Sequence, residues 1–178
     1  VEARKASVKT QVEMGMSILE YYAGRTDLDE AAAKAAALEA LAQVRTNGGV
    51  DYFFAVDPEL RLVLHPTRPA GTDMSDYRSE EGQYVYRDLL AAATSGDGFT
   101  EYSAPKPGSE GQQPKFGYSQ VFPAWNWTLS MGVYADDIQA SAWQFTRILT
   151  AIGAGLIAVF AGLCWLIATL IGNPLRKA

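Results

Sequence analysis

The segment from Ile148 to Ile171, ILTAIGAGLIAVFAGLCWLIATLI, contains no charged residue. As a helix it would be about 36 Å long, which is enough to cross the hydrocarbon core of a bilayer with some tilt. A buried core helix is the alternative, but a domain this small could hardly surround such a segment on every side. We therefore expect a transmembrane helix at residues 148–171.

The charges that follow this segment predict its orientation. Arg176 and Lys177 come directly after it, and the positive-inside rule places such residues in the cytoplasm. Residues 1–145 are then expected outside the cytoplasm. Because no signal peptide precedes them, we also expect a first membrane span upstream of residue 1.

The composition limits what kind of domain residues 1–145 can form and which partners it can bind. The chain has 178 residues, 48% of them hydrophobic, and a net charge of -5 with a pI near 4.9. That length suits one folded core, and the scattered lysines and arginines offer no basic surface for nucleic acid. The single cysteine, Cys164, lies in the apolar segment, so no intrachain disulfide is expected.

The N-terminal 22 residues, VEARKASVKTQVEMGMSILEYY, carry an apolar stripe at nearly heptad spacing. The pattern predicts a long helix at 1–23 that pairs with the same helix of a second copy, giving a homodimer. The stripe consists of Val8, Val12, Gly15, Leu19 and Tyr22.

Two further helices are expected, at about 29–46 and 84–94. Thr26 to Asp29 offers a capping box for the first, and Gly48 or Gly49 could end it in a left-handed cap.

Elsewhere the hydrophobic period changes to two, which is typical of strands. The fold class is therefore α+β, with five strands in an antiparallel sheet. The expected strands are 50–56, 60–65, 99–104, 115–122 and 127–134.

The first two strands form a hairpin around Pro58 that ends at His65, the single histidine of the chain. A turn centred on Pro58 and Glu59 would set Val56 opposite Arg61 and Tyr52 opposite His65. His65 would then lie on one face with Tyr52 and Phe54. An odd loop or a bulge would reverse this arrangement.

In this order, the motifs GGVDYFFAVD, HP, GDGFTEYSAPKPG and PKFGYSQVFPAWNWTLSMGVYADDI resemble the single Cache (sCache, Cache type 2) sensor domains of bacterial methyl-accepting chemotaxis proteins. The resemblance covers about residues 1–145. It implies a PAS-like fold in the periplasm of an inner-membrane receptor. It also implies a HAMP-type linker within 172–178, followed by a cytoplasmic signalling module of chemotaxis, histidine kinase or cyclic-nucleotide type. Recognition of a small carboxylate such as acetate, propionate, pyruvate or lactate is implied as well.

A carboxylate pocket needs a few convergent donors in an aromatic wall. The expected donors are His65, Lys115, Tyr118, Tyr102 and Tyr52, and the expected walls are Phe54, Met74 and Trp127. Each also has a structural explanation: the aromatic residues could be core, and Lys115 a solvated strand end. Strand alternation puts Lys115 and Tyr118 on opposite faces, so both reach one ligand only through a bulge or at the sheet edge. If His65 binds as an imidazolium, binding should weaken as the pH rises past its pKa.

Catalytic functions are less well supported. A membrane-anchored hydrolase would need a nucleophile motif, and the sequence contains no nucleophile elbow and no ligand spacing typical of a metal site. We expect no enzyme activity, no metal and no cofactor.

Overall fold

The computed structural model describes residues 2–106 and 111–134, together with Thr150, Gly153, Ile157 and Gly162. The chain divides into two compact units, Val1–Asp136 and Asp137–Ala178, and every helix and strand considered below lies in the first. Among the described residues, no helix combines the length and the apolar character needed to span a bilayer. The predicted transmembrane helix and linker fall almost entirely outside these residues and stay predictions.

Helices α1 (Glu2–Ala23) and α2 (Glu30–Gln43) pack against each other and against the sheet, which both helices contact directly. The carboxylate of Asp29 caps α2 by accepting a hydrogen bond from the backbone N–H of Ala32 at 2.7 Å. The bounds of α1 agree with the long helix predicted at 1–23.

Six strands form one antiparallel sheet. Their order is β1-β2-β6-β5-β4, with β3 also paired to β2. The strands are β1 (Arg45–Thr46), β2 (Asp51–Val56), β3 (Leu62–Leu64), β4 (Phe99–Pro105), β5 (Gln112–Phe122) and β6 (Trp127–Tyr134). The two-residue β1 is an addition to the five strands that were predicted.

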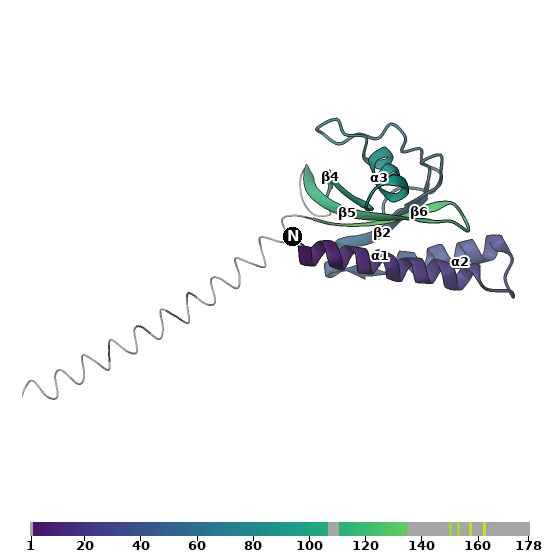
Figure 1. Cartoon of the computed structure of the whole chain (residues 1–178), viewed down its shortest axis with the longest axis horizontal. Helices are drawn as coiled ribbons and strands as arrows, with labels where there is room; N and C mark the ends of the chain where they lie inside the picture. Colours follow the sequence, from purple (N-terminus) through teal and green to yellow (C-terminus); the bar gives the residue numbers. More distant parts are fainter. Residues whose placement is uncertain are drawn as a thin grey trace, which may run out of the picture. The chain divides into compact units, whose positions relative to one another are not determined.

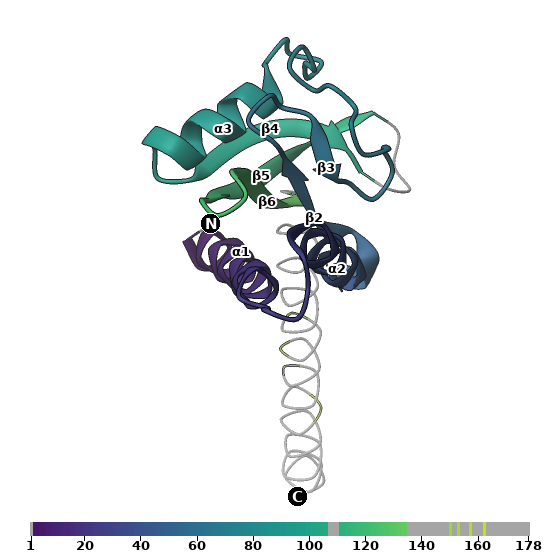
Figure 2. The same ribbon diagram turned by 90° about the vertical axis from the view of Figure 1, so that its right-hand side faces the viewer.

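The sheet is covered on both faces, so the first unit has three layers. Helices α1 and α2 cover one face, while α3 (Val85–Ser95) and the long loop after β3 cover the other (Figures 1 and 2). Each face has its own core: Phe53 and Leu129 of the sheet pack beneath α1, and Phe54 of the sheet packs with Leu89 of α3 on the other side. Two buried faces explain why β2 is apolar at successive positions.

The helix predicted at 29–46 ends earlier, at Gln43. Val44 already has an extended backbone, and Arg45 pairs with Tyr52 of β2. The two glycines serve the turn between β1 and β2, where Gly48 has a φ of 67° and Gly49 a φ of 93°. The left-handed conformation of the glycines was therefore predicted correctly. Their role was not, because they form a turn between strands and not the end of a helix.

The predicted register of the hairpin is wrong in detail. Val56 pairs with Leu62 rather than Arg61, and a bulge then pairs Ala55 with Leu64. Leu60 occupies the left-handed region of the loop, with a φ of 60°. The odd loop alone would move His65 to the other face, but the bulge shifts the register by one more residue and restores it.

The apolar stripe of α1 faces the chain's own sheet. Val8, Val12 and Leu19 are 0% exposed. A Cβ on Gly15 would lie 2.8 Å from Leu129 Cδ2 and 2.9 Å from Phe53, so only glycine allows α1 to approach so closely. The stripe is consequently not available to a second copy, and its assignment to a dimer contact was wrong.

Candidate functional site

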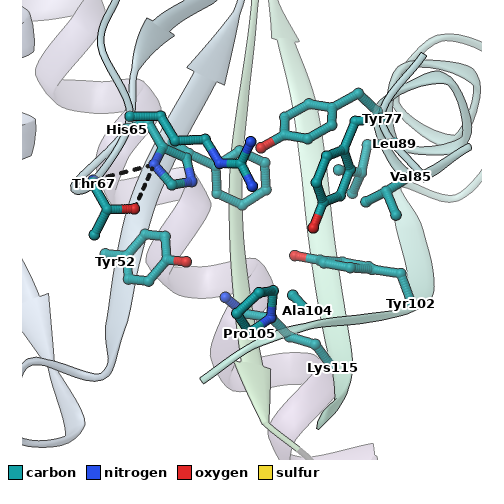
Figure 3. A pocket seen from close by; sticks show the side chains of 13 residues that line it. Tyr52, His65, Thr67, Tyr77, Val85, Leu89, Tyr102, Ala104, Pro105 and Lys115 are labelled. Atoms are coloured by element: carbon teal, nitrogen blue, oxygen red, sulfur yellow. Dashed lines mark hydrogen bonds between the residues drawn. The ribbon is translucent and has the colours of Figure 1, made fainter. Parts of the chain in front are cut away.

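A cavity of about 80 Å³ lies between the sheet and α3. Strands β2, β4 and β5 form its floor, α3 forms one wall, and the loop after β3 covers it (Figure 3). Five of the residues predicted from the sequence line it together: Tyr52, Phe54, His65, Tyr102 and Lys115.

Tyr118 and Trp127 lie on the opposite face, in the core beneath α1 and α2. Tyr118 packs on Phe99 with 4.8 Å between ring centroids, and Trp127 packs on Trp125 at 4.9 Å. Strand β5 pairs with β6 in unbroken register, so alternation separates Lys115 from Tyr118 as expected for a strand without a bulge. The prediction that Tyr118 and Trp127 reach the pocket was wrong.

Met74 lies close to the cavity without lining it. Its side chain is 1% exposed and belongs to the core between the sheet and α3. Its sulfur lies 4.0 Å from an Nη1 of Arg68, which does line the cavity. Met74 therefore supports the loop that covers the cavity and is not one of its walls.

Lys115 is the buried cation of the site, with a side chain that is 2% exposed. Its Nζ lies 4.4 Å from the ring centroid of Tyr52 and 4.6 Å from that of Tyr134. Burial lowers the pKa of Lys115 to about 8, and the negative charge of Asp51 acts in the other direction by raising it. At neutral pH the side chain is still mainly an ammonium ion.

Two glycines make room for the side chains on the floor of the cavity. A Cβ on Gly132 would lie 2.8 Å from Lys115 Cε and 2.8 Å from Tyr102 Oη. A Cβ on Gly117 would lie 2.9 Å from Tyr102 Cε1. Glycine at these two strand positions lets the side chains of Lys115 and Tyr102 lie close to the backbone of the sheet. Glycine within a strand often marks such a close approach.

Tyr102 supplies a neutral donor. Its hydroxyl is buried and has no hydrogen-bond partner in the part of the chain that the structure describes. Figure 3 shows this hydroxyl directed into the cavity. Burial raises the pKa of Tyr102 well above its ordinary value, so the phenol stays protonated and its O–H can donate a hydrogen bond to a ligand. A buried hydroxyl without a partner is costly, and a ligand acceptor would remove that cost.

His65 lies beside two aromatic rings, as the sequence predicted. Its ring centroid is 5.7 Å from that of Tyr52 and 6.3 Å from that of Phe54. The backbone N–H of Thr67 donates to its Nδ1 at 3.2 Å, so in the neutral ring the proton is on Nε2.

His65 is neutral at physiological pH. Burial, followed by the charges of Arg68, Lys115 and Arg45, lowers its pKa to about 4. The condition for a pH dependence near the ordinary pKa of histidine, a charged imidazolium, is therefore not met in the ligand-free protein. What His65 offers is one neutral N–H donor.

The covering loop adds residues that the sequence analysis missed. The Arg68 guanidinium lies 4.8 Å from the ring centroid of Tyr77, and both residues line the cavity. The available signal was an arginine three residues after His65, a predicted site residue, but nothing in the sequence showed that the loop folds back over the sheet.

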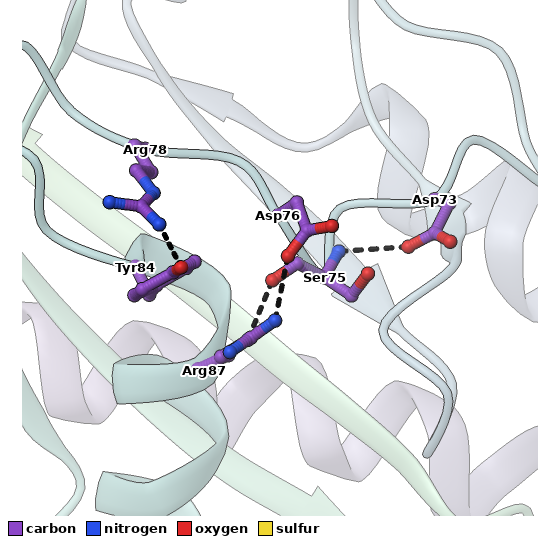
Figure 4. A network of polar contacts seen from close by, with 6 residues as sticks. All are labelled: Asp73, Ser75, Asp76, Arg78, Tyr84 and Arg87. Carbon is purple, nitrogen blue, oxygen red and sulfur yellow. Dashed lines mark hydrogen bonds and ion pairs between the residues drawn. The ribbon is translucent and has the colours of Figure 1, made fainter.

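Contacts with α3 hold this loop in place (Figure 4). Arg87 of α3 donates to the backbone carbonyl of Ser75 and forms an ion pair with Asp76, both at 2.7 Å. Arg78 donates to the hydroxyl of Tyr84. The cover of the cavity is thus joined to the helix that forms its wall.

The site has the chemistry of an anion-binding pocket. Lys115 and Arg68 bring positive charge, and no acidic side chain is among the described residues that line the cavity. Tyr102 and His65 add neutral donors, while Phe54 and the α3 side chains form apolar walls. A few convergent donors within an aromatic wall suit a small anion with a short apolar part.

Comparison with known proteins gives one family. The family model described as Single Cache domain 2 matches residues 1–147. The chain is 31% identical over 182 residues to the methyl-accepting chemotaxis protein McpP of Pseudomonas putida, covering 99% of this chain and 34% of that protein. It is 24% identical to the sensor histidine kinase MctS of Rhizobium johnstonii, covering 80% of this chain and 31% of that protein. The chain spans about a third of the length of these curated relatives.

Solved structures give the same result. A methyl-accepting chemotaxis protein from Vibrio parahaemolyticus is 34% identical with a TM-score of 0.69, covering 77% of this chain and 92% of that one. A Cache chemosensory domain described for its carboxylic acid recognition is 30% identical with a TM-score of 0.70, covering 75% of this chain and 95% of that one. These relatives are chemoreceptor sensor domains, which bind ligands and are not enzymes.

Proposed function

Because the chain belongs to the single Cache domain 2 family, we propose that it is the periplasmic sensor region of a bacterial chemoreceptor whose cavity binds a small monocarboxylate. The observation that carries the proposal is the buried ammonium of Lys115, which lines a small cavity with no acidic lining residue among those described. A desolvated cation is costly unless an anion compensates it. The charge of Asp51 offsets part of this cost, and a ligand carboxylate in the cavity would offset more of it.

Size supports an acid of two or three carbons. The cavity of about 80 Å³ is small beside the roughly 300–1,000 Å³ of pockets that hold drug-sized ligands. Acetate, propionate, pyruvate and lactate are much smaller than such ligands. Carboxylic acid recognition by a related Cache domain is consistent with the same ligand class.

The remaining parts of the proposal concern the membrane. The predicted helix at 148–171 would anchor the receptor in the inner membrane, with residues 1–145 in the periplasm and Arg176 in the cytoplasm. Relatives include chemotaxis receptors and a sensor histidine kinase. We favour a chemotaxis signalling module downstream because the similarity to McpP is higher and covers nearly the whole chain.

Calorimetry on the chain in detergent tests the ligand class. At a ceiling of about -1.5 kcal/mol per heavy atom, an acid of about six heavy atoms cannot exceed about -9 kcal/mol, so we expect micromolar or weaker binding. Propionamide is the matched control because it keeps the shape of propionate and lacks its charge, and it should bind at least tenfold more weakly. Equal binding of propionate and propionamide, or no binding of any of the four acids, would refute the proposed ligand class.

We also propose a homodimer, formed by the outward face of α1. An uncharged row with alternating spacings of three and four residues runs along this face, as in a coiled-coil seam. It consists of Ser7, Thr10, Met14, Ser17 and Tyr21, all exposed. Met14 is 57% and Tyr21 61% exposed, so this row contains two of the large apolar side chains that are exposed among the described residues. The same helix of a second copy would match the spacing of this row.

Cysteine crosslinking distinguishes the two faces of α1. In a Cys164→Ala background in membranes, Met14→Cys and Tyr21→Cys should form disulfide-linked dimers. Lys9→Cys is the exposed control on the flank of the helix, and it should crosslink less. Crosslinking at Lys9 equal to that at Met14 would exclude this dimer face.

A further inference from the structure

The ammonium of Lys115 lies between two tyrosine rings that come from different strands. Tyr52 belongs to β2 and Tyr134 is the last residue of β6, directly paired with Lys115 across the sheet. The ring centroids lie 4.4 Å and 4.6 Å from Nζ. Both distances are within the range of cation–π attraction, which is strongest where the cation is shielded from water. We call these two rings the aromatic cage.

The backbone fixes one ring of the cage. The hydroxyl of Tyr134 donates to the carbonyl of Pro105 at 2.6 Å, and Pro105 lines the cavity. Tyr134 is 0% exposed. On the same strand, Gly132 leaves room for the stem of Lys115, whose Cε would lie 2.8 Å from a Cβ at that position. The stem and the head of Lys115 are thus both positioned by β6.

Other charged groups surround the cage. Asp51 favours the ammonium form of Lys115. Arg45 lies 6.0 Å from the Tyr52 ring centroid and Lys106 lies 5.4 Å from that of Tyr134, so each ring also faces a second cation. Glu81 and Glu101 lie with Lys115 along a neighbouring groove. His65 and Arg68 complete the set on the covering side, and the hydroxyls of Tyr77, Tyr86 and Tyr102 remain as neutral neighbours.

We propose that Tyr134 and Tyr52 are positioning residues, which hold the Lys115 ammonium at the cavity before a carboxylate arrives. This inference rests on the proposed function. A lysine has a flexible four-carbon stem and loses rotamer freedom when it binds a ligand. A side chain that is already held between two rings loses less, so the cage increases affinity through preorganisation.

The test of the cage does not depend on ligand binding. In the full chain labelled with ¹³C and ¹⁵N lysine, NMR titration reports the pKa of Lys115, and Lys115→Met identifies its signal. Tyr134→Leu removes the ring face and should lower this pKa by roughly 0.5–1.5 pH units, because attraction to the charged form is lost. Tyr134→Phe keeps the ring and removes only the hydroxyl, so it should leave the pKa close to its original value. Tyr52→Leu and Tyr52→Phe repeat the comparison at a less buried position, in case Tyr134→Leu fails to fold.

Acetate affinity is measured on the same variants by calorimetry. The leucine variants should lose about three- to tenfold at pH 7, and the phenylalanine variants clearly less. If leucine and phenylalanine variants have the same Lys115 pKa, or if leucine raises it, the cage is refuted. If the wild-type chain binds no carboxylate, the proposed function fails, while the pKa comparison still decides whether the rings hold the ammonium.

Discussion

Lys115→Met should weaken acetate and propionate binding by about ten- to a hundredfold, corresponding to the roughly 1.5–3 kcal/mol of a charge-assisted hydrogen bond. Methionine keeps the length of the side chain and its apolar contacts, so the change removes mainly the charge. Lys115 is 2% exposed and lines the cavity. In the variant, water has little access to the ligand carboxylate and cannot easily replace the hydrogen bond that the ammonium donates. Calorimetry on the wild-type and variant chains at pH 7 measures the effect.

Two further variants make this result specific. Lys9→Met is the same substitution on α1, where Lys9 is exposed and lies over Tyr118 on the other face of the sheet, and affinity should not change. His65→Ala removes a neutral donor and should cost less than Lys115→Met, about 0.5–1.5 kcal/mol. Equal affinities of wild type and Lys115→Met would remove Lys115 from the site even if a carboxylate binds.

Carboxylate affinity should be constant from about pH 6 to 7 and then decrease as the pH rises through about 8, the pKa of Lys115. Above that pKa the free site loses its ammonium, and affinity falls by up to about tenfold per pH unit. Tyr52 and Tyr102 have raised pKa values and stay neutral over the same range. His65, with a pKa of about 4, is neutral throughout and contributes no step near pH 6.5. A decrease in affinity centred between pH 6 and 7 would indicate that His65 titrates instead.

The same group should have the opposite effect on the stability of the ligand-free protein. Between pH 8 and 10.5 the unfolded chain binds the Lys115 proton and the folded chain has released it, so the free energy of unfolding rises with pH. The gain can reach about 3 kcal/mol over this interval. Denaturant unfolding gives the free energy of unfolding of wild type and of Lys115→Met at each pH. The difference between the two proteins should change between pH 8 and 10.5. Parallel curves would mean that Lys115 is not desolvated in the folded protein.

Most of the fold could be predicted because its elements have strong local patterns. The helix at the N-terminus, the helix near 84–94 and strand 127–134 are within one residue of their observed bounds. The errors lie where tertiary contacts decide. Helix α2 ends early because Arg45 pairs with β2, and the stripe of α1 serves an intrachain core rather than a partner. Periodicity shows that a face is apolar but does not show what covers it.

The site residues that could be predicted are those whose side of the sheet follows from alternation along one strand. Tyr52 and Phe54 share a face through the parity of β2, and His65 joins them because a loop and a bulge compensate each other. Lys115 shares this face through its pairing across β6, which the sequence does not show. Parity also argued against Tyr118, which the observed sheet places on the other face. Arg68 and Tyr77 could not be predicted, because they reach the cavity only through the path of a long loop. The neutral state of His65 depends on burial and on Arg68, which no sequence pattern reports.

A crystal structure of the chain with propionate would show directly whether Lys115 binds the carboxylate. We expect the carboxylate in the cavity between the sheet and α3, with one oxygen within about 2.7–3.2 Å of Lys115 Nζ and the other near the hydroxyl of Tyr102 or Nε2 of His65. The ethyl group should contact the apolar wall that includes Phe54. Propionate bound elsewhere on the molecule, or in the cavity with its carboxylate turned away from Lys115, would show that Lys115 does not bind the ligand.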